Sequence, residues 1–273
     1  MDARELYRTT QPTSWAAAPH KYSFSSLKRM GICLRQWQLA RSSYGLLRAY
    51  PERPSEPAHV GTIVHDLLSK LFRAAALAGY PPLGSEEFQQ VVQRVDILGT
   101  ARAKLEAFAM NAGKSPRALA FQLQTTPRDV YNKVAQAFRD EYASVAARAS
   151  ELLPIQGPAP NEVVSSASPG DRRALLEEWG MLSEEEVNHP TLPLRGVIDL
   201  LVRRDGKTTV LDFKTGAPHA EHRDQLLLYA LMWWRSTGDL AGSIELRYGA
   251  RVEAWPVSED DLRSAESAAQ AII

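Results

Sequence analysis

The stretch from Arg195 to Lys214, Arg-Gly-Val-Ile-Asp-Leu-Leu-Val-Arg-Arg-Asp-Gly-Lys-Thr-Thr-Val-Leu-Asp-Phe-Lys, decides the fold of this chain. An Asp-Gly pair between two apolar runs is the strongest short-range signal for a β-hairpin. A two-residue turn at Asp205-Gly206 places Arg204 opposite Lys207 across the hairpin. The stretch therefore predicts two antiparallel strands whose register is set by this turn.

The register brings two acidic side chains and one basic side chain together. Counting outward from the turn, Asp199 falls opposite Asp212, and Lys214 follows two residues later on the same face. The neighbouring residues are apolar on both faces of the strands, which is typical of strands that are covered on both sides. Buried carboxylates that face each other repel, and a hard divalent cation such as Mg²⁺ removes that repulsion. We therefore expect a magnesium site here.

Two other interpretations of the hairpin remain open at this point. Lys214 could simply neutralise one aspartate within a buried triad, or the hairpin could lie at an exposed edge where its charges cost little. A slip of one residue in the register would also move Asp199 and Asp212 to opposite faces.

Three further polar residues are candidates for the same site. Gln225 and Tyr229 are four residues apart in a predicted helix that is otherwise largely apolar, so they share one face of it. For these two residues taken alone, ordinary amphipathic packing is the favoured explanation. His65 lies in an earlier predicted helix, where a lone histidine is more often a structural residue than a metal ligand.

The remaining pattern indicates an α/β fold with a helical subdomain. Helical periodicity starts at Ser23 or Ser25 and runs to Leu39, then recurs over about 60–78, several times within 85–150, over about 220–236 and from Ser258 onward. Strand-like segments lie near 173–180, 194–203, 208–214, 243–248 and 251–256. We divide the chain into a flexible arm (1–21), N-terminal helices (22–84), a helical insertion (85–152), a linker (153–170) and a core (171–273).

Composition excludes several classes of protein. The chain of 273 residues has 32 basic and 32 acidic side chains, so a nucleic-acid contact needs a local basic patch. Cys33 is the single cysteine, which excludes an intrachain disulfide or a four-cysteine iron–sulfur cluster. We find neither a signal peptide nor an apolar run long enough to span a bilayer, and we expect a soluble, cytoplasmic protein without a membrane partner.

Four segments, in this order along the chain, resemble the RecB-like branch of the PD-(D/E)XK nuclease superfamily. The resemblance covers about residues 22–72 and 173–256 and leaves out the helical insertion. It implies a restriction-endonuclease-like core, in which helices flank a mixed central sheet. The segments are Gly61-Thr-Ile-Val-His65, Arg195-Gly-Val-Ile-Asp199-Leu, Leu211-Asp212-Phe-Lys214-Thr-Gly and Gln225-Leu-Leu-Leu-Tyr229-Ala; the start Tyr22-Ser-Phe-Ser-Ser-Leu27, followed by Cys33, is also similar.

The resemblance also implies roles for individual residues. His65, Asp199, Asp212 and the Phe213 carbonyl would hold Mg²⁺, for which Mn²⁺ would substitute. Lys214 would position or activate the attacking water or stabilise the developing charge. Gln225 and Tyr229 would support the site and the nucleic-acid strand. Some relatives add an acid from the first core strand, and Glu177 or Glu178 would take that place here.

The function expected from this resemblance is metal-dependent hydrolysis of nucleic acid, most simply DNA, by an exonuclease or endonuclease. No Gly-x4-Gly-Lys-Ser/Thr loop is present, so any ATP hydrolysis would come from a partner such as a helicase, in DNA repair or phage defence. The alternative is a non-catalytic nucleic-acid-binding or adaptor subunit of such a complex.

The insertion allows a helix-turn-helix interpretation. Two short helices flanking Gln124-Thr-Thr would present Arg128, Asn132 and Lys133 to a duplex. Plain helical packing is the favoured alternative. If the insertion does guide nucleic acid, its basic residues would contribute, and these are Arg117, Arg128, Lys133 and Arg139.

Overall fold

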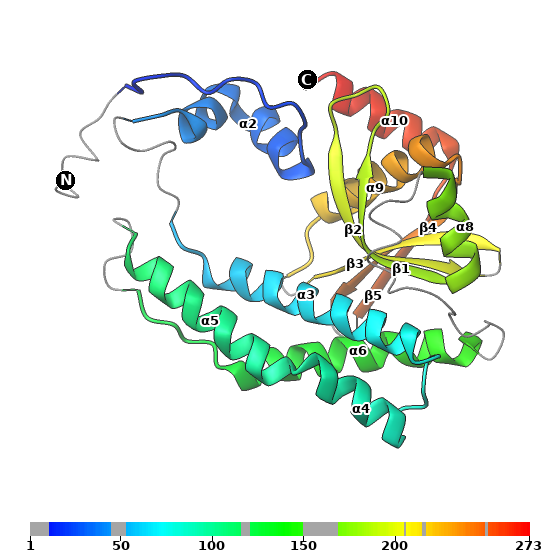
Figure 1. Ribbon diagram of the computed structural model, residues 1–273. Coiled ribbons are helices and arrows are strands. Elements are labelled where there is room, and N and C mark those ends of the chain that lie inside the picture. The colour runs from blue at the N-terminus through cyan, green and yellow to red at the C-terminus, as the bar shows by residue number, and fades with distance from the viewer. Residues whose placement is uncertain are drawn as a thin grey trace.

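A five-stranded sheet forms the centre of the protein, and helices cover both of its faces (Figure 1). The computed structural model describes residues 11–44, 53–115, 121–149, 169–204, 206–214, 217–248 and 251–273. The helices in these ranges are α2 (Phe24–Arg41), α3 (Glu56–Leu77), α4 (Glu86–Val95), α5 (Ile97–Gly113), α6 (Pro127–Ala149), α8 (Pro169–Trp179), α9 (Glu221–Thr237) and α10 (Glu259–Gln270). The strands are β1 (Met181–Asn188), β2 (Arg195–Arg204), β3 (Lys207–Phe213), β4 (Ala241–Tyr248) and β5 (Arg251–Pro256). This arrangement confirms the predicted α/β fold class.

The sheet is mixed, with strand order β1-β2-β3-β4-β5. β3 and β4 are parallel and are connected through α9, whereas every other neighbouring pair is antiparallel. In the β2–β3 hairpin Arg204 pairs with Lys207, as predicted. Gly206 has a φ of 71°, the left-handed conformation that the turn requires. The predicted register is confirmed as far as Leu200, which lies opposite Leu211.

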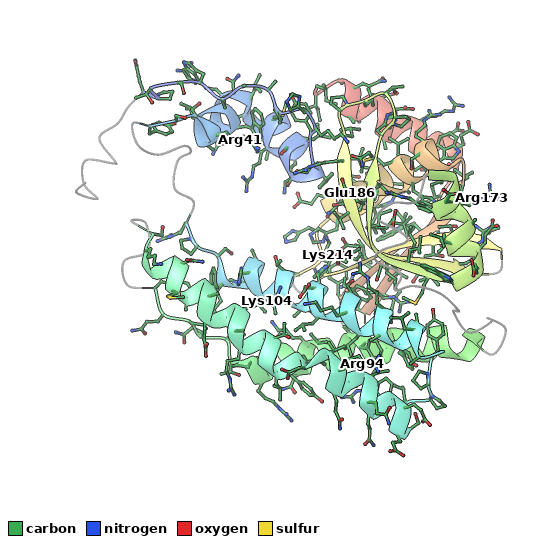
Figure 2. The ribbon with its side chains drawn as sticks, in the orientation of Figure 1. Arg41, Arg94, Lys104, Arg173, Glu186 and Lys214 are labelled. Atoms are coloured by element: carbon green, nitrogen blue, oxygen red, sulfur yellow. The ribbon has the colours of Figure 1, made fainter. Side chains whose placement is uncertain are left out.

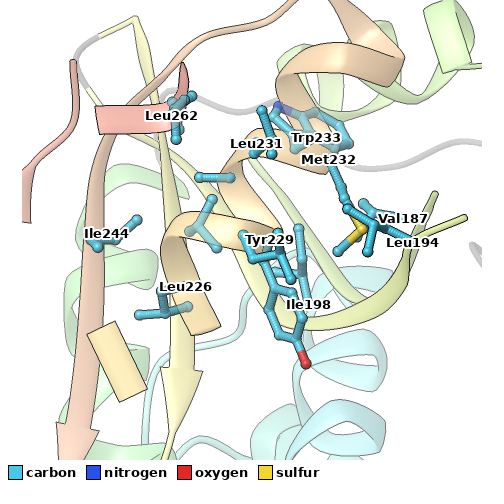
Figure 3. Close-up of a cluster of buried hydrophobic side chains, with 14 of the residues drawn as sticks. Val187, Leu194, Ile198, Leu226, Tyr229, Leu231, Met232, Trp233, Ile244 and Leu262 are labelled. Carbon is cyan, nitrogen blue, oxygen red and sulfur yellow. The ribbon is translucent and has the colours of Figure 1, made fainter. Parts of the chain in front are cut away.

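Two apolar clusters, one on each face of the sheet, hold the layers together. The first joins the sheet to α2, α8, α9 and α10, and Trp233 of α9 is its largest fully buried side chain (Figure 3). The second joins the sheet to α3, α4, α5 and α6 around Phe72 and Tyr142. The ring of Phe72 stacks on that of Phe213 with centroids 6.2 Å apart, so α3 packs directly against the end of β3.

The strand predicted near 173–180 is wrong, because this segment belongs to helix α8. Arginine, alanine, leucine and glutamate all favour a helix, and Gly180, with a φ of 73°, ends it. The first strand begins one residue later, at Met181. Its glutamates at 184–186 are poor strand formers, so the sequence pattern did not indicate a strand there. The predicted linker falls outside the described residues except for 169–170, which already belong to α8.

The described residues of the insertion favour plain helical packing over the helix-turn-helix interpretation, whose first helix lies largely outside them. Residues 121–126 contain no helix, and the second expected helix is the beginning of the 23-residue α6. Val130, Val134 and Phe138 of α6 are buried in the cluster that packs on α3. Arg117 lies outside the described residues. The insertion is therefore a packed helical layer that covers one face of the sheet.

The described part of the predicted N-terminal arm is tied to the end of α2. The backbone N–H of Thr13 donates to the Ser43 carbonyl, and the N–H of Ser43 donates to the Ser14 carbonyl. The Ala16 N–H donates to the Ser42 hydroxyl at 3.1 Å. In the described ranges, no helix combines the length and the apolar character needed to cross a membrane.

The contact between β2 and α9 leaves no room for a side chain at Gly196. A Cβ placed there would lie 2.6 Å from a ring carbon of Tyr229 and 2.9 Å from the methyl group of Met232. We predict that Gly196→Ala lowers the free energy of unfolding by about 1–3 kcal/mol, the usual cost of overpacking. Urea denaturation followed by circular dichroism measures this change.

Gly113→Ala is the matched control. Gly113 lies at the end of α5, and a Cβ there would meet nothing within 4 Å. This substitution should leave stability unchanged or slightly raised. Equal stability of the Gly196 and Gly113 variants would contradict the close packing of β2 on α9.

Candidate active site

Asp212 is the most deeply buried acidic group of the site, with 3% of its surface exposed. It lies near the end of β3, and its Oδ2 is 2.7 Å from the Lys214 Nζ. Burial raises the pKa of this carboxyl well above its usual range, and the negative charge of Asp199 raises it further. Lys214 and His65 oppose the increase in pKa without cancelling it. The positive charge of Lys214 and His65 is thus too small to keep the pKa of Asp212 in its usual range.

Asp199 of β2 joins the two strands beyond their last backbone pair. Its Oδ2 accepts the Phe213 N–H at 2.9 Å, so a side chain replaces a backbone partner there. The same oxygen is 2.9 Å from the Nδ1 of His65, which reaches it from α3. Burial disfavours the protonated form of His65, but the charge of Asp199 and its hydrogen bond outweigh burial and raise the His65 pKa to about 9. His65 is therefore an imidazolium paired with Asp199 at neutral pH.

Lys214 is oriented from the opposite layer, by α9. Its Nζ donates to the Gln225 Oε1 at 2.9 Å, and the Gln225 Nε2 donates to the Tyr229 hydroxyl at 2.8 Å. The ring of Tyr229 lies in the apolar cluster beside Ile198, and its hydroxyl points out of that cluster (Figure 3). Gln225 and Tyr229, one turn apart, therefore fix the position of Lys214, and simple amphipathic packing does not account for them.

Glu184 of β1 is a site residue that the sequence analysis missed. The β1–β2 register, with Ser183 opposite Leu200 and Glu185 opposite Ile198, places Glu184 opposite Asp199. Burial and the charge of Asp199 raise the pKa of the Glu184 carboxyl. The backbone φ of Glu184 is 53°, in the left-handed region. Residues other than glycine rarely adopt this conformation, and those that do are often found near functional sites.

Glu177 and Glu178, the predicted additional acids, lie on helix α8 and not on the first strand. Glu177 pairs with Arg173 and Arg203, away from the other acids. The signal that would have identified Glu184 is the hairpin geometry of β1 and β2. Counting back from Asp199 across the short connection at 189–194 leads to this residue.

A cavity of about 560 Å³ opens over His65, Asp199 and Glu184. Its opposite wall comes from the helical layer and includes Thr62 of α3 and Lys104 of α5. Asp212 and Lys214 are not among the described residues that line this cavity. Asp199 and Glu184 are therefore the strand carboxylates that a substrate in the cavity can reach.

The described residues contain no three His, Cys, Asp or Glu side chains already arranged as a metal cage. His65 and Lys214 each hold one aspartate instead. The chemistry of the site nevertheless fits a hard cation, because Asp212 and Glu184 have raised pKa values and carboxylate oxygens are the preferred ligands of Mg²⁺.

Comparison with known proteins identifies a sequence family and similar solved structures. The sequence model described as "PD-(D/E)XK nuclease superfamily" matches residues 21–271. No protein with a curated description matches the chain. The crystal structure of SSO0001 is similar over 52% of this chain and 71% of its own chain, with 16% sequence identity and a TM-score of 0.22.

The ion pair of His65 predicts how stability depends on pH in the metal-free protein. Because the folded state raises the His65 pKa from 6.5 to about 9, the folded state binds this proton more tightly than the unfolded state does. The stabilisation is complete below pH 6.5 and disappears as the pH rises through 9. The free energy of unfolding in chelator should fall across this range, by up to about 3 kcal/mol.

His65→Gln serves as the comparison, since glutamine does not titrate. Urea denaturation at several pH values should show a shallower decline for this variant than for the original protein. Parallel declines in the two proteins would show that the His65–Asp199 pair does not contribute.

Proposed function

The chain belongs to the PD-(D/E)XK nuclease superfamily, and from this premise we propose that it hydrolyses phosphodiester bonds with a divalent cation at Asp199 and Asp212. The observation that carries the proposal is the buried Asp212 carboxylate, whose negative charge Lys214 and His65 compensate only in part. A structural ion pair would be balanced within the protein. A site that is short of positive charge and lies beside a cavity is suited to binding a cation.

Asp199, Asp212, His65 and the Phe213 carbonyl are the proposed ligands, and Glu184 replaces Glu177 or Glu178 as the additional acid. Mg²⁺ is the proposed ion, with Mn²⁺ as a substitute. When bound, such an ion stabilises negative charge on phosphoryl oxygens and provides a nucleophilic water at neutral pH. To act as a ligand, His65 would have to give up its proton and exchange its bond to Asp199 for one to the ion.

Lys214 is the proposed catalytic cation of the protein itself. Its ammonium group lies between Asp212 and Gln225 and has a further N–H to offer to an attacking water or a phosphoryl oxygen. Because Tyr229 and Gln225 hold it from α9, the ammonium is already positioned before the reaction, which lowers the cost of stabilising the developing charge.

DNA is the proposed substrate, on the resemblance of the site segments to RecB-like nucleases. That resemblance also supports work beside a helicase or another ATPase in repair or phage defence. Cys33, alone in the chain, cannot complete an iron–sulfur cluster with other cysteines. A non-catalytic adaptor is the second candidate, but loss of catalysis usually accompanies loss of the acids or the lysine, and all of them are present here.

We predict that Asp199→Ala, Asp212→Ala and Lys214→Ala each abolish cleavage, lowering its rate by at least about 100-fold, because each removes charge that acts on the reacting phosphate. A cleavage assay on labelled single-stranded and duplex DNA, with Mg²⁺ or Mn²⁺, measures the rate. Circular dichroism establishes that each variant is folded.

Glu178→Ala is the control, since Glu178 is an acid on α8 outside the site. It should cleave at the original rate. A folded Asp199 or Asp212 variant with the original rate would disprove the site, and an inactive original protein on every substrate would favour the adaptor.

Metal binding gives a prediction that does not depend on cleavage. Mn²⁺ at about 100 times its dissociation constant should stabilise the protein by about 2.7 kcal/mol and raise its Tm. Asp199→Ala should lose this increase, whereas Glu178→Ala should keep it. Cleavage should stop in chelator and return with either ion. Full activity in excess chelator, or an equal Tm increase in Asp199→Ala, would rule out this metal site.

A further inference from the structure

The helical wall of the active-site cavity consists mainly of α3, and the insertion contributes Lys104 of α5 to it. No motif in the sequence singles out this residue. We infer that Lys104 binds a phosphate of the nucleic-acid strand beside the phosphate that is cleaved. The inference rests on the proposed nuclease function and adds a substrate-binding residue that belongs to the insertion.

The acidic lining of the cavity would repel a nucleic-acid strand unless a basic residue offset its charge. Three carboxylates line it, those of Asp66, Glu184 and Asp199, and Lys104 is the single lysine or arginine among the described lining residues. Even with the His65 imidazolium counted, the described lining has a net charge of −1, which opposes the entry of a polyanion. The bound cation offsets that charge at the cleaved phosphate, and an ammonium on the opposite wall offsets it at a neighbouring phosphate.

An ion pair with Asp66 positions Lys104, but this carboxylate does not fully neutralise the charge of Lys104. Its Nζ lies 3.0 Å from the Asp66 Oδ2, and the Lys70 Nζ lies 2.9 Å from the same oxygen. Two ammonium groups thus share one carboxylate, and the trio has a net charge of +1. Because Lys70 pairs with Asp66 within α3, Lys104 can turn to a phosphate while Asp66 keeps a partner.

The position of Lys104 relative to the acids is set by α3. Asp66 follows His65 directly in this helix, so the carboxylate that orients Lys104 lies next to the residue that contacts Asp199. Figure 2 shows Lys104 on the helical layer and Lys214 at the end of the sheet. Lys104 therefore comes from the helical layer and Lys214 from the end of the sheet, as expected for residues that contact successive parts of one strand.

Lys70 offers a matched control within the same ion-pair trio. It binds the same oxygen and has a similar side-chain exposure, 46% against 40% for Lys104, but it does not line the cavity. If Lys104 acts only through Asp66, Lys70→Ala and Lys104→Ala should have equal effects. If Lys104 contacts phosphate, only Lys104→Ala should weaken binding.

The test measures binding of a fluorescent single-stranded oligonucleotide by anisotropy in chelator, so that no cleavage occurs, at several salt concentrations. Lys104→Ala should raise Kd about tenfold, as expected for one charged hydrogen bond. The slope of log affinity against log salt should become shallower by about 0.7, the value for one phosphate contact on a single strand. Lys104→Arg should largely restore both, and Lys70→Ala should resemble the original protein.

Kinetics with Mg²⁺ provide a second readout. Loss of a contact made equally to substrate and transition state raises KM and leaves kcat nearly unchanged. Equal Kd and salt slope in Lys104→Ala and the original protein, or equal losses in Lys104→Ala and Lys70→Ala, would overturn the inference while leaving the nuclease function intact. An original protein that neither binds nor cleaves the oligonucleotide would instead reject the proposed function itself.

Discussion

The repulsion between Asp199 and Asp212 at the end of the β2–β3 hairpin constrains the surrounding structure. Two unit charges about 5 Å apart repel by about 3 kcal/mol at an effective dielectric constant of about 20. Asp212 is nearly inaccessible to water, so solvent cannot screen its charge. The protein therefore has to supply positive charge from elements outside the hairpin, and the residues that do so are His65 and Lys214.

The two helical layers divide this task between them. His65 of α3 contacts Asp199. The position of α3 depends in turn on the apolar contact of Phe72 with Phe213. α9 delivers Gln225 and Tyr229, which orient Lys214. Each polar contact is thus supported by one of the two apolar clusters, and the site forms only when both layers are packed on the sheet. A substitution that loosens either layer should therefore disturb the positions of the site residues as well as the stability of the fold.

The parts of the site that are close in sequence could be predicted from it. The Asp-Gly turn determines the pairing of Arg204 with Lys207, and the register of the hairpin follows by counting. Gln225 and Tyr229 share a helix face for a similarly local reason. The contact of His65 with Asp199 joins residues far apart in the chain, and only the resemblance to a family indicated it.

Glu184 was missed because its strand was not recognised, and Lys104 could not be predicted because non-local packing decides its position. Glu184 lies in an acidic run that disfavours a strand, and the burial of β1 against its neighbours overrides that local preference. Lys104 is one of several basic residues in the insertion, and its proximity to the acids depends on how α5 packs on α6 and α3. Helical periodicity identifies such helices but does not determine which of their faces lines a cavity.

The most direct test of the account is the number of protons released when Mn²⁺ binds. Isothermal titration calorimetry at neutral pH, in buffers of different ionisation enthalpy, measures this number. His65 holds a proton at that pH because Asp199 raises its pKa, and binding of a cation to Asp199 and Asp212 should expel it. We predict release of about one proton from His65, together with the fraction of a proton that Asp212 holds, and a smaller release in His65→Gln. Binding without proton release, or no saturable binding at all, would contradict the view that this buried charge arrangement is a metal site.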